Sequence, residues 1–153
     1  MEEQTRQVEI VKGDLLKSNS EMLVHQVNMQ GVMGAGLAKQ IRKRYPEVYR
    51  DYKNRYKEFN LGDNLYCSTS DGHIIVNMFS QKDYGRSGLF TDYDAMEIAL
   101  FKIAEIAMKH DVSVGIPYGI GCGLGGGNWE EVYARINKAF KNCNLAKIKI
   151  YKL

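Results

Sequence analysis

The sequence is poor in features that mark several classes of protein. It has only 2 prolines and 3 cysteines among 153 residues, and no apolar run approaches the roughly 20 residues needed to span a bilayer. The scarcity of proline, with an apolar fraction of 44% and a charged fraction of 25%, argues against collagen-like, low-complexity and disordered chains. What is left is a globular chain, and its length suits one domain, residues 1–153, with its own core.

Cysteine and histidine spacing gives no sign of a disulfide framework or a metal site. Cys67, Cys122 and Cys143 lie far apart with no CxxC pattern, and the three histidines lack ligand spacing. We expect reduced thiols, no metal and no cofactor. The first ten residues are acidic and polar, unlike a secretory signal, which begins basic and continues apolar. We therefore expect a cytoplasmic protein.

Positive charge is concentrated in one segment. The net charge is only +3, yet residues 39–58 hold eight Lys or Arg against three acids, and residues 132–153 hold no acid. Such segments form solvated helix faces or sites for an anionic ligand or nucleic acid. The spacing of Tyr45, Tyr49, Tyr52 and Tyr56 is typical of a core-facing helical stripe, but stacked tyrosines also suit single-stranded nucleic acid. We favour the stripe and keep the nucleic-acid binder as an alternative.

Apolar patterning predicts six strands separated mainly by helices. Asp71-Gly72 is a hairpin turn signal between two of the strands. The expected strands are residues 8–12, 22–28, 65–69, 73–79, 112–117 and 147–151.

Helices are expected between these strands. One covers residues 36–45, and Pro46 suits the first turn of the next. Thr91 with Asp94 resembles a capping box that opens a helix to about residue 109, and Asn128 with Glu131 opens another to about residue 141. This mainly β-α-β order predicts an α/β fold, in which a mixed sheet of about six strands carries helices on both faces.

Residues 118–127 contain six glycines between an expected strand and the start of a helix. Such a loop lets several backbone N–H groups point at one anion, and the helix N-terminus adds partial positive charge; a plain surface turn needs fewer glycines. Gly121, Gly123 and Gly126 match the GxGxxG dinucleotide fingerprint, but no acid lies about twenty residues further on, and no Walker GK[ST] is present. We therefore expect a phosphate site of another kind.

A second glycine cluster spans residues 31–38, again between a strand and a helix. The carboxyl ends of parallel strands in an α/β sheet share one crevice, so two such loops could hold a diphosphate from both sides. The alternative is close helix–sheet packing through small residues.

Taken together, these motifs resemble those of the macrodomain family. The resembling segments are residues 11–15 (VKGDL), 25–38 (HQVN through MGAGLA), 77–81 (NMFSQ), 91–93 (TDY) and 116–129. They cover nearly the whole chain in order. The chain is most similar to phage-type members that process ADP-ribose-1''-phosphate and to the related terminal ADP-ribose protein glycohydrolases. The resemblance implies a three-layer αβα fold with ADP-ribose across the carboxyl edge of the sheet.

The resemblance also implies which residues bind the ligand. Asp14, with Leu15 beside it, would accept a hydrogen bond from the adenine amino group, although Asp14 could instead cap the segment that follows it. Asn28 would meet the distal ribose hydroxyls, and Tyr151 and Leu153 would wall the adenine. The phosphate loops would contribute Met33, Gly34, Ala35, Gly36, Leu37, Gly119, Ile120, Gly121, Cys122, Gly123, Leu124 and Gly125.

The catalytic residues of the similar glycohydrolases are not matched. Their lysine after the fourth strand and their aspartate in the late glycine loop correspond to Gln81 and Gly125. Neither residue can act as a nucleophile or acid–base group, so we do not expect that mechanism. His25, Asn28 and Gln81 are the catalytic candidates near the distal ribose. An imidazole titrates near neutrality and could serve as general acid or base, and the alternative for His25 is a structural hydrogen bond.

Two functions follow from the resemblance. The first is slow hydrolysis of ADP-ribose-1''-phosphate, or of a related ADP-ribosyl derivative, at the distal ribose by a phosphatase or ADP-ribosyl hydrolase. The second is an ADP-ribose reader without turnover. The expected partner is ADP-ribose, free or attached to a macromolecule, and we expect no membrane partner.

Overall fold

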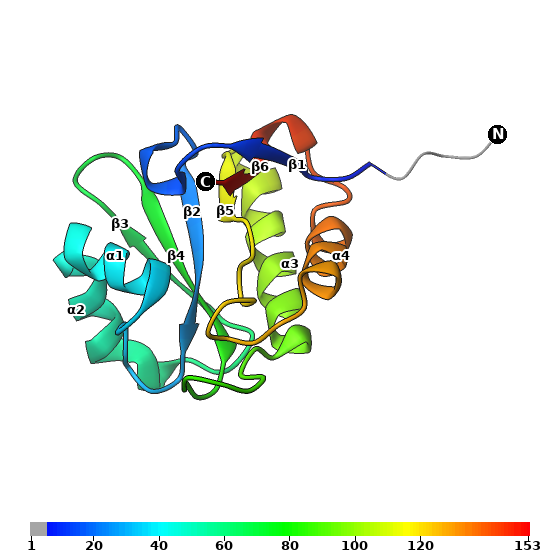
Figure 1. The fold of residues 1–153 in the computed structure, drawn as a ribbon. Coiled ribbons are helices and arrows are strands. Elements are labelled where there is room, and N and C mark those ends of the chain that lie inside the picture. The colour runs from blue at the N-terminus through cyan, green and yellow to red at the C-terminus, as the bar shows by residue number, and fades with distance from the viewer. Residues whose placement is uncertain (1–5) are drawn as a thin grey trace.

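A mixed six-stranded sheet forms the centre of the fold. The computed structural model describes residues 6–153. The strands lie in the order β1-β6-β5-β2-β4-β3, and every neighbouring pair is parallel except the β3–β4 hairpin (Figure 1). The strands are β1 (Glu9–Lys12), β2 (Met22–Asn28), β3 (Asn64–Ser68), β4 (Ile74–Gln81), β5 (Val114–Pro117) and β6 (Ile148–Lys152). The predicted mixed sheet is confirmed. The single domain over residues 1–153 stays a prediction, since residues 1–5 lie outside the described part.

Within residues 6–153, four α-helices cover the two faces of the sheet, which confirms the three-layer αβα arrangement. On one side lie α1 (Gly36–Arg44) and α2 (Pro46–Arg55), and on the other α3 (Tyr93–His110) and α4 (Trp129–Ala139) (Figure 1). Short 3-10 turns occupy η1 (Leu15–Lys17), η2 (Tyr56–Glu58) and η3 (Leu145–Lys147). In the described residues, no helix combines the length and apolar character that crossing a membrane requires.

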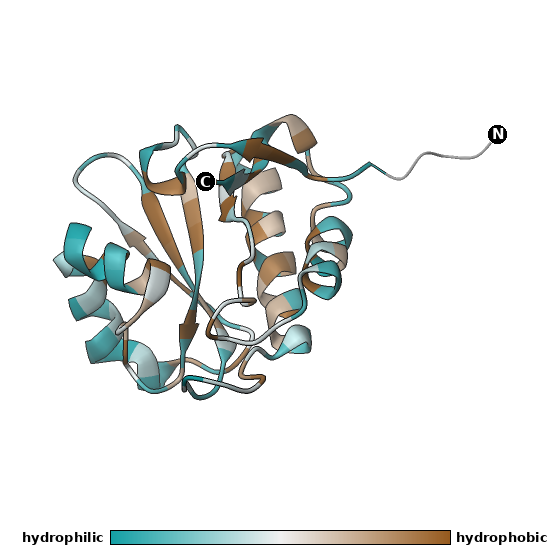
Figure 2. Cartoon of the chain, viewed as in Figure 1, coloured by the Kyte–Doolittle hydropathy of each residue, from teal (hydrophilic) through white to brown (hydrophobic). Residues whose placement is uncertain are grey.

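Alternation along β2 divides the core into two layers. Met22 and Val24 pack towards α3 and α4, whereas Leu23 and Val27 pack towards α1 and α2. Successive side chains of a strand point to opposite faces, so an apolar strand fills both layers at once. In Figure 2 the strands and α3 are largely brown, while α2 is largely teal. The outer surface of the α1–α2 layer is therefore polar.

The tyrosines in and beside α2 face the core, as the helical spacing predicts. Tyr52 is fully buried and Tyr45 nearly so, while Tyr49 and Tyr56 pack on the same core layer with part of each ring exposed. The stripe interpretation is confirmed.

The start of α3 differs from the prediction by one residue. Asp92, not Thr91, caps the helix, and its carboxylate accepts a hydrogen bond from the Ala95 N–H at 2.9 Å. The hydroxyl of Thr91 instead donates to the Gly121 carbonyl at 2.7 Å, because Thr91 is buried against the glycine loop. The Asn128 cap of α4 is as predicted.

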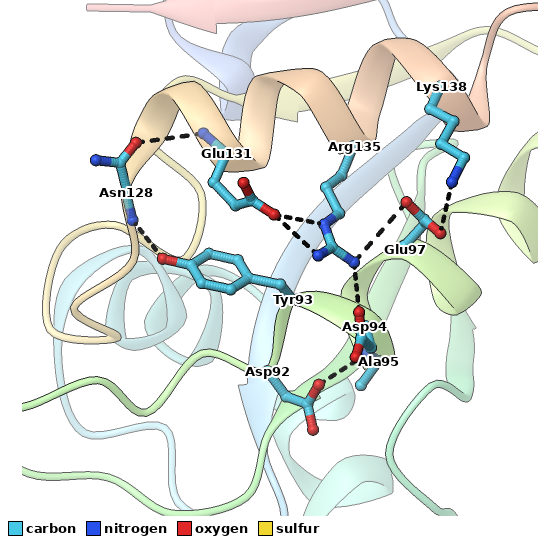
Figure 3. Close-up of polar contacts among 9 residues, drawn as sticks. All are labelled: Asp92, Tyr93, Asp94, Ala95, Glu97, Asn128, Glu131, Arg135 and Lys138. Carbon is cyan, nitrogen blue, oxygen red and sulfur yellow. Dashed lines mark hydrogen bonds and ion pairs between the residues drawn. The ribbon is translucent and has the colours of Figure 1, made fainter.

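A polar cluster joins α3 to α4 beside the end of the glycine loop (Figure 3). The Tyr93 hydroxyl accepts a hydrogen bond from the Asn128 N–H at 2.8 Å. The Arg135 guanidinium lies 2.7 Å from a carboxylate oxygen of Asp94 and 2.8 Å from one of Glu131. These contacts fix the point at which the glycine loop enters α4.

Candidate functional site

A cleft of about 690 Å³ lies at the carboxyl ends of β2, β4 and β5. These three strands are parallel, so the loops that follow them meet at one edge of the sheet. The loops contribute residues 32, 34–38, 81, 84–86, 117–121 and 123–125 to its wall, together with the end of β2. Both predicted glycine loops therefore line one cleft.

The first glycine loop leaves the N-terminus of α1 open. Gly36 begins the helix with φ of +57°, and Ala35 at the N-cap provides no side-chain hydrogen bond. The first N–H groups of a helix have no partner within it, which makes such an end a site for an anion. A Cβ built on Gly36 would meet no atom within 4 Å, so the position faces open space.

The second glycine loop has an open part and a tightly packed part. A Cβ on Gly119 or Gly123 would meet nothing within 4 Å. A Cβ on Gly125, in contrast, would lie 2.5 Å from Thr91 Oγ1 and 2.7 Å from the Gly121 carbonyl oxygen. The Gly125 carbonyl also accepts the N–H groups of Phe90 and Thr91, at 2.7 and 3.0 Å. Position 125 therefore has no room for an aspartate while the loop keeps this conformation.

Gln81 belongs to a hydrogen-bonded group that sequence reasoning missed. Gln26 Nε2 donates to Gln81 Oε1 at 2.9 Å and to Thr91 Oγ1 at 3.0 Å, and Gln26 Oε1 accepts from Ser80 Oγ at 2.7 Å. Gln81 Nε2 donates to the Asp83 carbonyl at 2.6 Å. Gln26, which lines the cleft, thus joins β2, β4 and the segment before α3. The only signal in the sequence was a polar residue inside an apolar strand.

Asn28 holds the turn that follows β2. Its Oδ1 accepts hydrogen bonds from the Gln30 N–H at 2.9 Å and the Tyr52 hydroxyl at 2.8 Å, and its Nδ2 donates to the Val32 carbonyl at 2.8 Å. Burial raises the pKa of Tyr52, so its hydroxyl stays protonated and remains a donor. One amide hydrogen of Asn28 has no acceptor among residues 6–153. Its contact with a distal ribose stays a prediction.

His25 lines the cleft but is 2% exposed, on the α1–α2 side of β2. Its Nε2 lies 2.7 Å from Asn77 Oδ1, and Asn77 Nδ2 donates to the Leu65 carbonyl, which orients the amide so that Nε2 carries the proton. Nδ1 is buried with no partner in the described chain. Burial lowers the pKa of His25 to about 4.

The expectation that His25 titrates near neutrality is therefore wrong. Desolvation disfavours the imidazolium by more than the hydrogen bond to Asn77 favours it. The ring is neutral at pH 7 and has no acidic proton to give there. Its place among the catalytic residues stays a prediction.

Asp14 and Tyr151 belong to neighbouring parts of the sheet edge and do not line the cleft. Asp14 lies two residues after β1, and Tyr151 lies near the end of the neighbouring strand β6. Tyr151 pairs with Pro117, and Pro117 lines the cleft. Asp14 Oδ1 caps η1 by accepting the Leu16 N–H at 3.0 Å, the alternative that the sequence left open. The Tyr151 hydroxyl lies 3.1 Å from Ser20 Oγ.

Four other predicted binding residues keep their side chains away from the cleft. Leu15 and Met33 are buried in the core layer under α1 and α2, and Leu153 is 89% exposed. Cys122 packs against the other core layer, and burial raises the pKa of its thiol. Their roles in binding stay predictions.

Tyr118 and Tyr84 also line the cleft, and so does Arg86, which the sequence did not single out. Tyr118 packs its ring 4.5 Å from that of Trp129, and the Lys152 ammonium lies 4.4 Å from the Tyr118 ring centre. Arg86 is the one Lys or Arg in the described chain that lines the cleft, beside Tyr84. A guanidinium in the wall of a cleft lined by two glycine loops suits an anionic ligand.

The described residues contain no group of three or more His, Cys, Asp or Glu side chains placed to hold a metal ion. Cys67, Cys122 and Cys143 are free thiols.

Comparisons with known proteins agree with this geometry, although no family model matches the chain. The DNA ADP-ribosyl glycohydrolase of Mycobacterium tuberculosis is 37% identical over 134 residues, which are 84% of this chain and 37% of that protein. The chain therefore spans well under half of that relative. The human ADP-ribose glycohydrolase OARD1 is 28% identical over 145 residues, 94% of this chain and 90% of the relative.

A solved structure matches almost the whole chain. The macrodomain of Mycobacterium tuberculosis DarG superimposes with a TM-score of 0.80 at 32% identity, and the match covers 95% of this chain and 97% of that one. The shared fold, the identity and the near-complete coverage show that this chain belongs to the macrodomain family.

Proposed function

We propose that this macrodomain binds the ADP-ribose group of an ADP-ribosyl derivative in the cleft and hydrolyses that derivative at the distal ribose. The observation that carries the proposal is the placement of both glycine loops along one cleft, one of them opening the uncapped N-terminus of α1. Backbone N–H groups and a helix N-terminus suit the two phosphates. Arg86 adds a positive charge on the same wall.

The names of the relatives favour a glycosidic substrate. They are named DNA ADP-ribosyl glycohydrolase and ADP-ribose glycohydrolase. In such a reaction water attacks C1'' of the distal ribose, the bond from C1'' to the leaving group breaks, and the water proton goes to the leaving group. ADP-ribose-1''-phosphate is the second candidate substrate, with phosphate as the leaving group.

The chain's own residues position the substrate more than they exchange protons. Gln81 is held by Gln26, Asn28 by the turn after β2, and His25 is neutral. Rate enhancement would come from holding the diphosphate and the attacking water, and from fixed dipoles around the ribose. A single general base contributes about 10²–10⁴-fold, so we expect slow turnover in its absence.

A reader without turnover is the second candidate function. The resemblance implies a lysine in the similar glycohydrolases where this chain has Gln81, and a Cβ on Gly125 would lie 2.5 Å from Thr91 Oγ1. The same cleft would then bind ADP-ribose and release it unchanged.

Gly123→Asp tests the binding half of the proposal. Because a Cβ there meets nothing within 4 Å, the substitution should keep the fold and place a carboxylate in the cleft. At about 8 Å and an effective dielectric constant of about 40, repulsion from two phosphate charges costs about 2 kcal/mol, or about 30-fold in Kd. Gly123→Asn is the matched neutral control. Equal affinities of the two variants for ADP-ribose in calorimetry would contradict the assignment.

Turnover is tested with the enzyme in excess over substrate. Release of ADP-ribose from an ADP-ribosylated oligonucleotide and of phosphate from ADP-ribose-1''-phosphate are followed by chromatography. Release from either substrate that is slower in Gly123→Asp than in Gly123→Asn, at enzyme concentrations below the Kd of the Asp variant, supports the hydrolase. Tight binding of ADP-ribose with neither product formed would identify the reader.

A further inference from the structure

A second hollow, of about 350 Å³, lies next to the cleft across one turn of the backbone. Asn28 and Val32 line the cleft, whereas Gln30 and Gly31, between them in sequence, line the hollow. The rest of its wall comes from the end of α2 and from η2: Lys53, Asn54, Tyr56 and Lys57. We call it the lysine hollow.

The lysine hollow is built by close packing. A Cβ on Gly31, which has φ of +75°, would lie 2.5 Å from Tyr56 Cε1, so the turn rests directly on that ring. The Gln30 side chain is tied to the Lys82 carbonyl at 3.1 Å, and Asn28 holds the turn from the other side. Cleft and hollow are thus two sides of one constrained turn.

Two lysines line this hollow, and no Asp or Glu does. Lys53 and Lys57 are four residues apart, and both are exposed. Neither forms an ion pair with an acid among residues 6–153. The contacts of their ammonium groups are with tyrosine rings, at 5.8 Å from the Tyr49 centre and 5.9 Å from the Tyr56 centre. Like charges at this spacing repel, so an anion between them would be stabilising.

The surrounding surface is basic as well. In α1, α2 and η2, only Arg44 and Arg55 of the eight basic residues are paired with acids of the described chain. Figure 2 shows α2 largely in teal. The Arg42 guanidinium lies over the ring of the partly exposed Tyr49, 4.0 Å from the ring centre. Lysines and arginines interleaved with aromatic rings suit a nucleic-acid strand, whose phosphates repeat along the surface.

We propose that the lysine hollow binds a backbone phosphate of a single nucleic-acid strand whose ADP-ribosyl group occupies the cleft. The proposal rests on the proposed function and names its substrate class. One turn separates the two sites, so a strand attached at the distal ribose would leave the cleft beside Lys53 and Lys57.

The test compares two double variants with the same change of charge. Lys53→Gln/Lys57→Gln removes the ammonium groups of the hollow, and Lys109→Gln/Lys141→Gln removes two exposed ones elsewhere. Fluorescence anisotropy measures binding of a short single-stranded DNA with and without one ADP-ribosyl group, at several salt concentrations. Calorimetry measures free ADP-ribose.

We expect the hollow variant to bind ADP-ribosylated DNA about tenfold more weakly, with a salt slope smaller by about 0.7 for each phosphate that the lysines no longer neutralise. Its affinity for free ADP-ribose should equal that of the wild type. Equal losses of affinity in both double variants, or no loss in the hollow variant, would overturn the proposal. The proposal would also be overturned if the hollow variant lost as much affinity for an ADP-ribosylated acidic peptide as for ADP-ribosylated DNA. The hollow would then bind a protein substrate.

Failure of the proposed function gives a different pattern. If the wild type binds no free ADP-ribose, the cleft assignment fails. Unmodified DNA still tests the lysine hollow in that case. The Lys53→Gln/Lys57→Gln variant should then bind unmodified DNA more weakly than the Lys109→Gln/Lys141→Gln control does.

Discussion

Gly125→Ala tests how tightly the glycine loop packs against the segment before α3. The new Cβ would lie 2.5 Å from Thr91 Oγ1, 2.7 Å from the Gly121 carbonyl oxygen and 2.9 Å from Gln26 Nε2. None of these atoms can move away without losing a hydrogen bond. Gln26 donates to Thr91, and Thr91 donates to the Gly121 carbonyl. Relief of the overlap must therefore break hydrogen bonds or move the loop.

The expected decrease in stability follows from these contacts. Overpacking costs about 1–3 kcal/mol, and two broken hydrogen bonds add about 1 kcal/mol each. Replacing glycine restricts the unfolded chain and returns about 0.4–1 kcal/mol. We expect the free energy of unfolding to fall by about 3 kcal/mol. An aspartate at Gly125 meets the same overlap, so Gly125→Asp should not create a working acid–base group.

Urea unfolding followed by the fluorescence of Trp129 measures this change. That ring packs between Tyr118 and Tyr133, so its emission reports on the end of the glycine loop. Gly123→Ala is the control, because its Cβ meets nothing within 4 Å, and it should stay within about 0.5 kcal/mol of wild type. A Gly125→Ala protein as stable as the control would refute the packing argument.

Three further predictions concern other buried or paired groups. Burial lowers the pKa of His25 from 6.5 to about 4, so its contribution to stability is present above pH 6.5 and is lost as pH falls towards 4, by up to about 3 kcal/mol. Urea unfolding of His25→Gln at pH 7 and pH 4.5 should lack this part of the pH dependence, and an unchanged dependence would contradict the buried neutral ring. Tyr52→Phe removes the hydroxyl that donates to the Asn28 carbonyl at 2.6 Å and to its Oδ1 at 2.8 Å, and should cost about 1–2 kcal/mol in the same assay. Arg135→Met breaks the ion pairs with Asp94 and Glu131, and should cost about 1 kcal/mol at low salt but less at about 1 M salt. A cost independent of salt would mean that packing of the side chain matters more than its charge.

Local signals in the sequence located most of the elements. The β2 strand begins and ends as predicted, because its apolar run is bounded by polar residues, and Pro46 marks the first residue of α2. Asp71-Gly72 identified the antiparallel pair β3–β4. The position of β6 between β1 and β5 depends on crossovers that no local pattern encodes.

Properties of the site that depend on tertiary packing were harder to predict. Glycine spacing located both loops of the cleft, since a chain needs glycine for such turns wherever they lie. The Gln26 network and the low pKa of His25 arise from neighbours on other strands, which the residue types alone do not identify. The sequence predicts Thr91 as the helix cap, because a Thr with an acid three residues later is typical of a cap. The residue that Thr91 actually contacts, Gly121, is thirty residues away, and no local pattern indicates it.

Calorimetric titration of ADP-ribose into the wild-type protein, with AMP and NAD as comparators, tests the central claim most directly. Two glycine loops along one cleft predict a micromolar Kd for ADP-ribose and clearly weaker binding of AMP, which lacks the second phosphate and the distal ribose. The absence of any binding heat at millimolar ADP-ribose would contradict the assignment of the cleft.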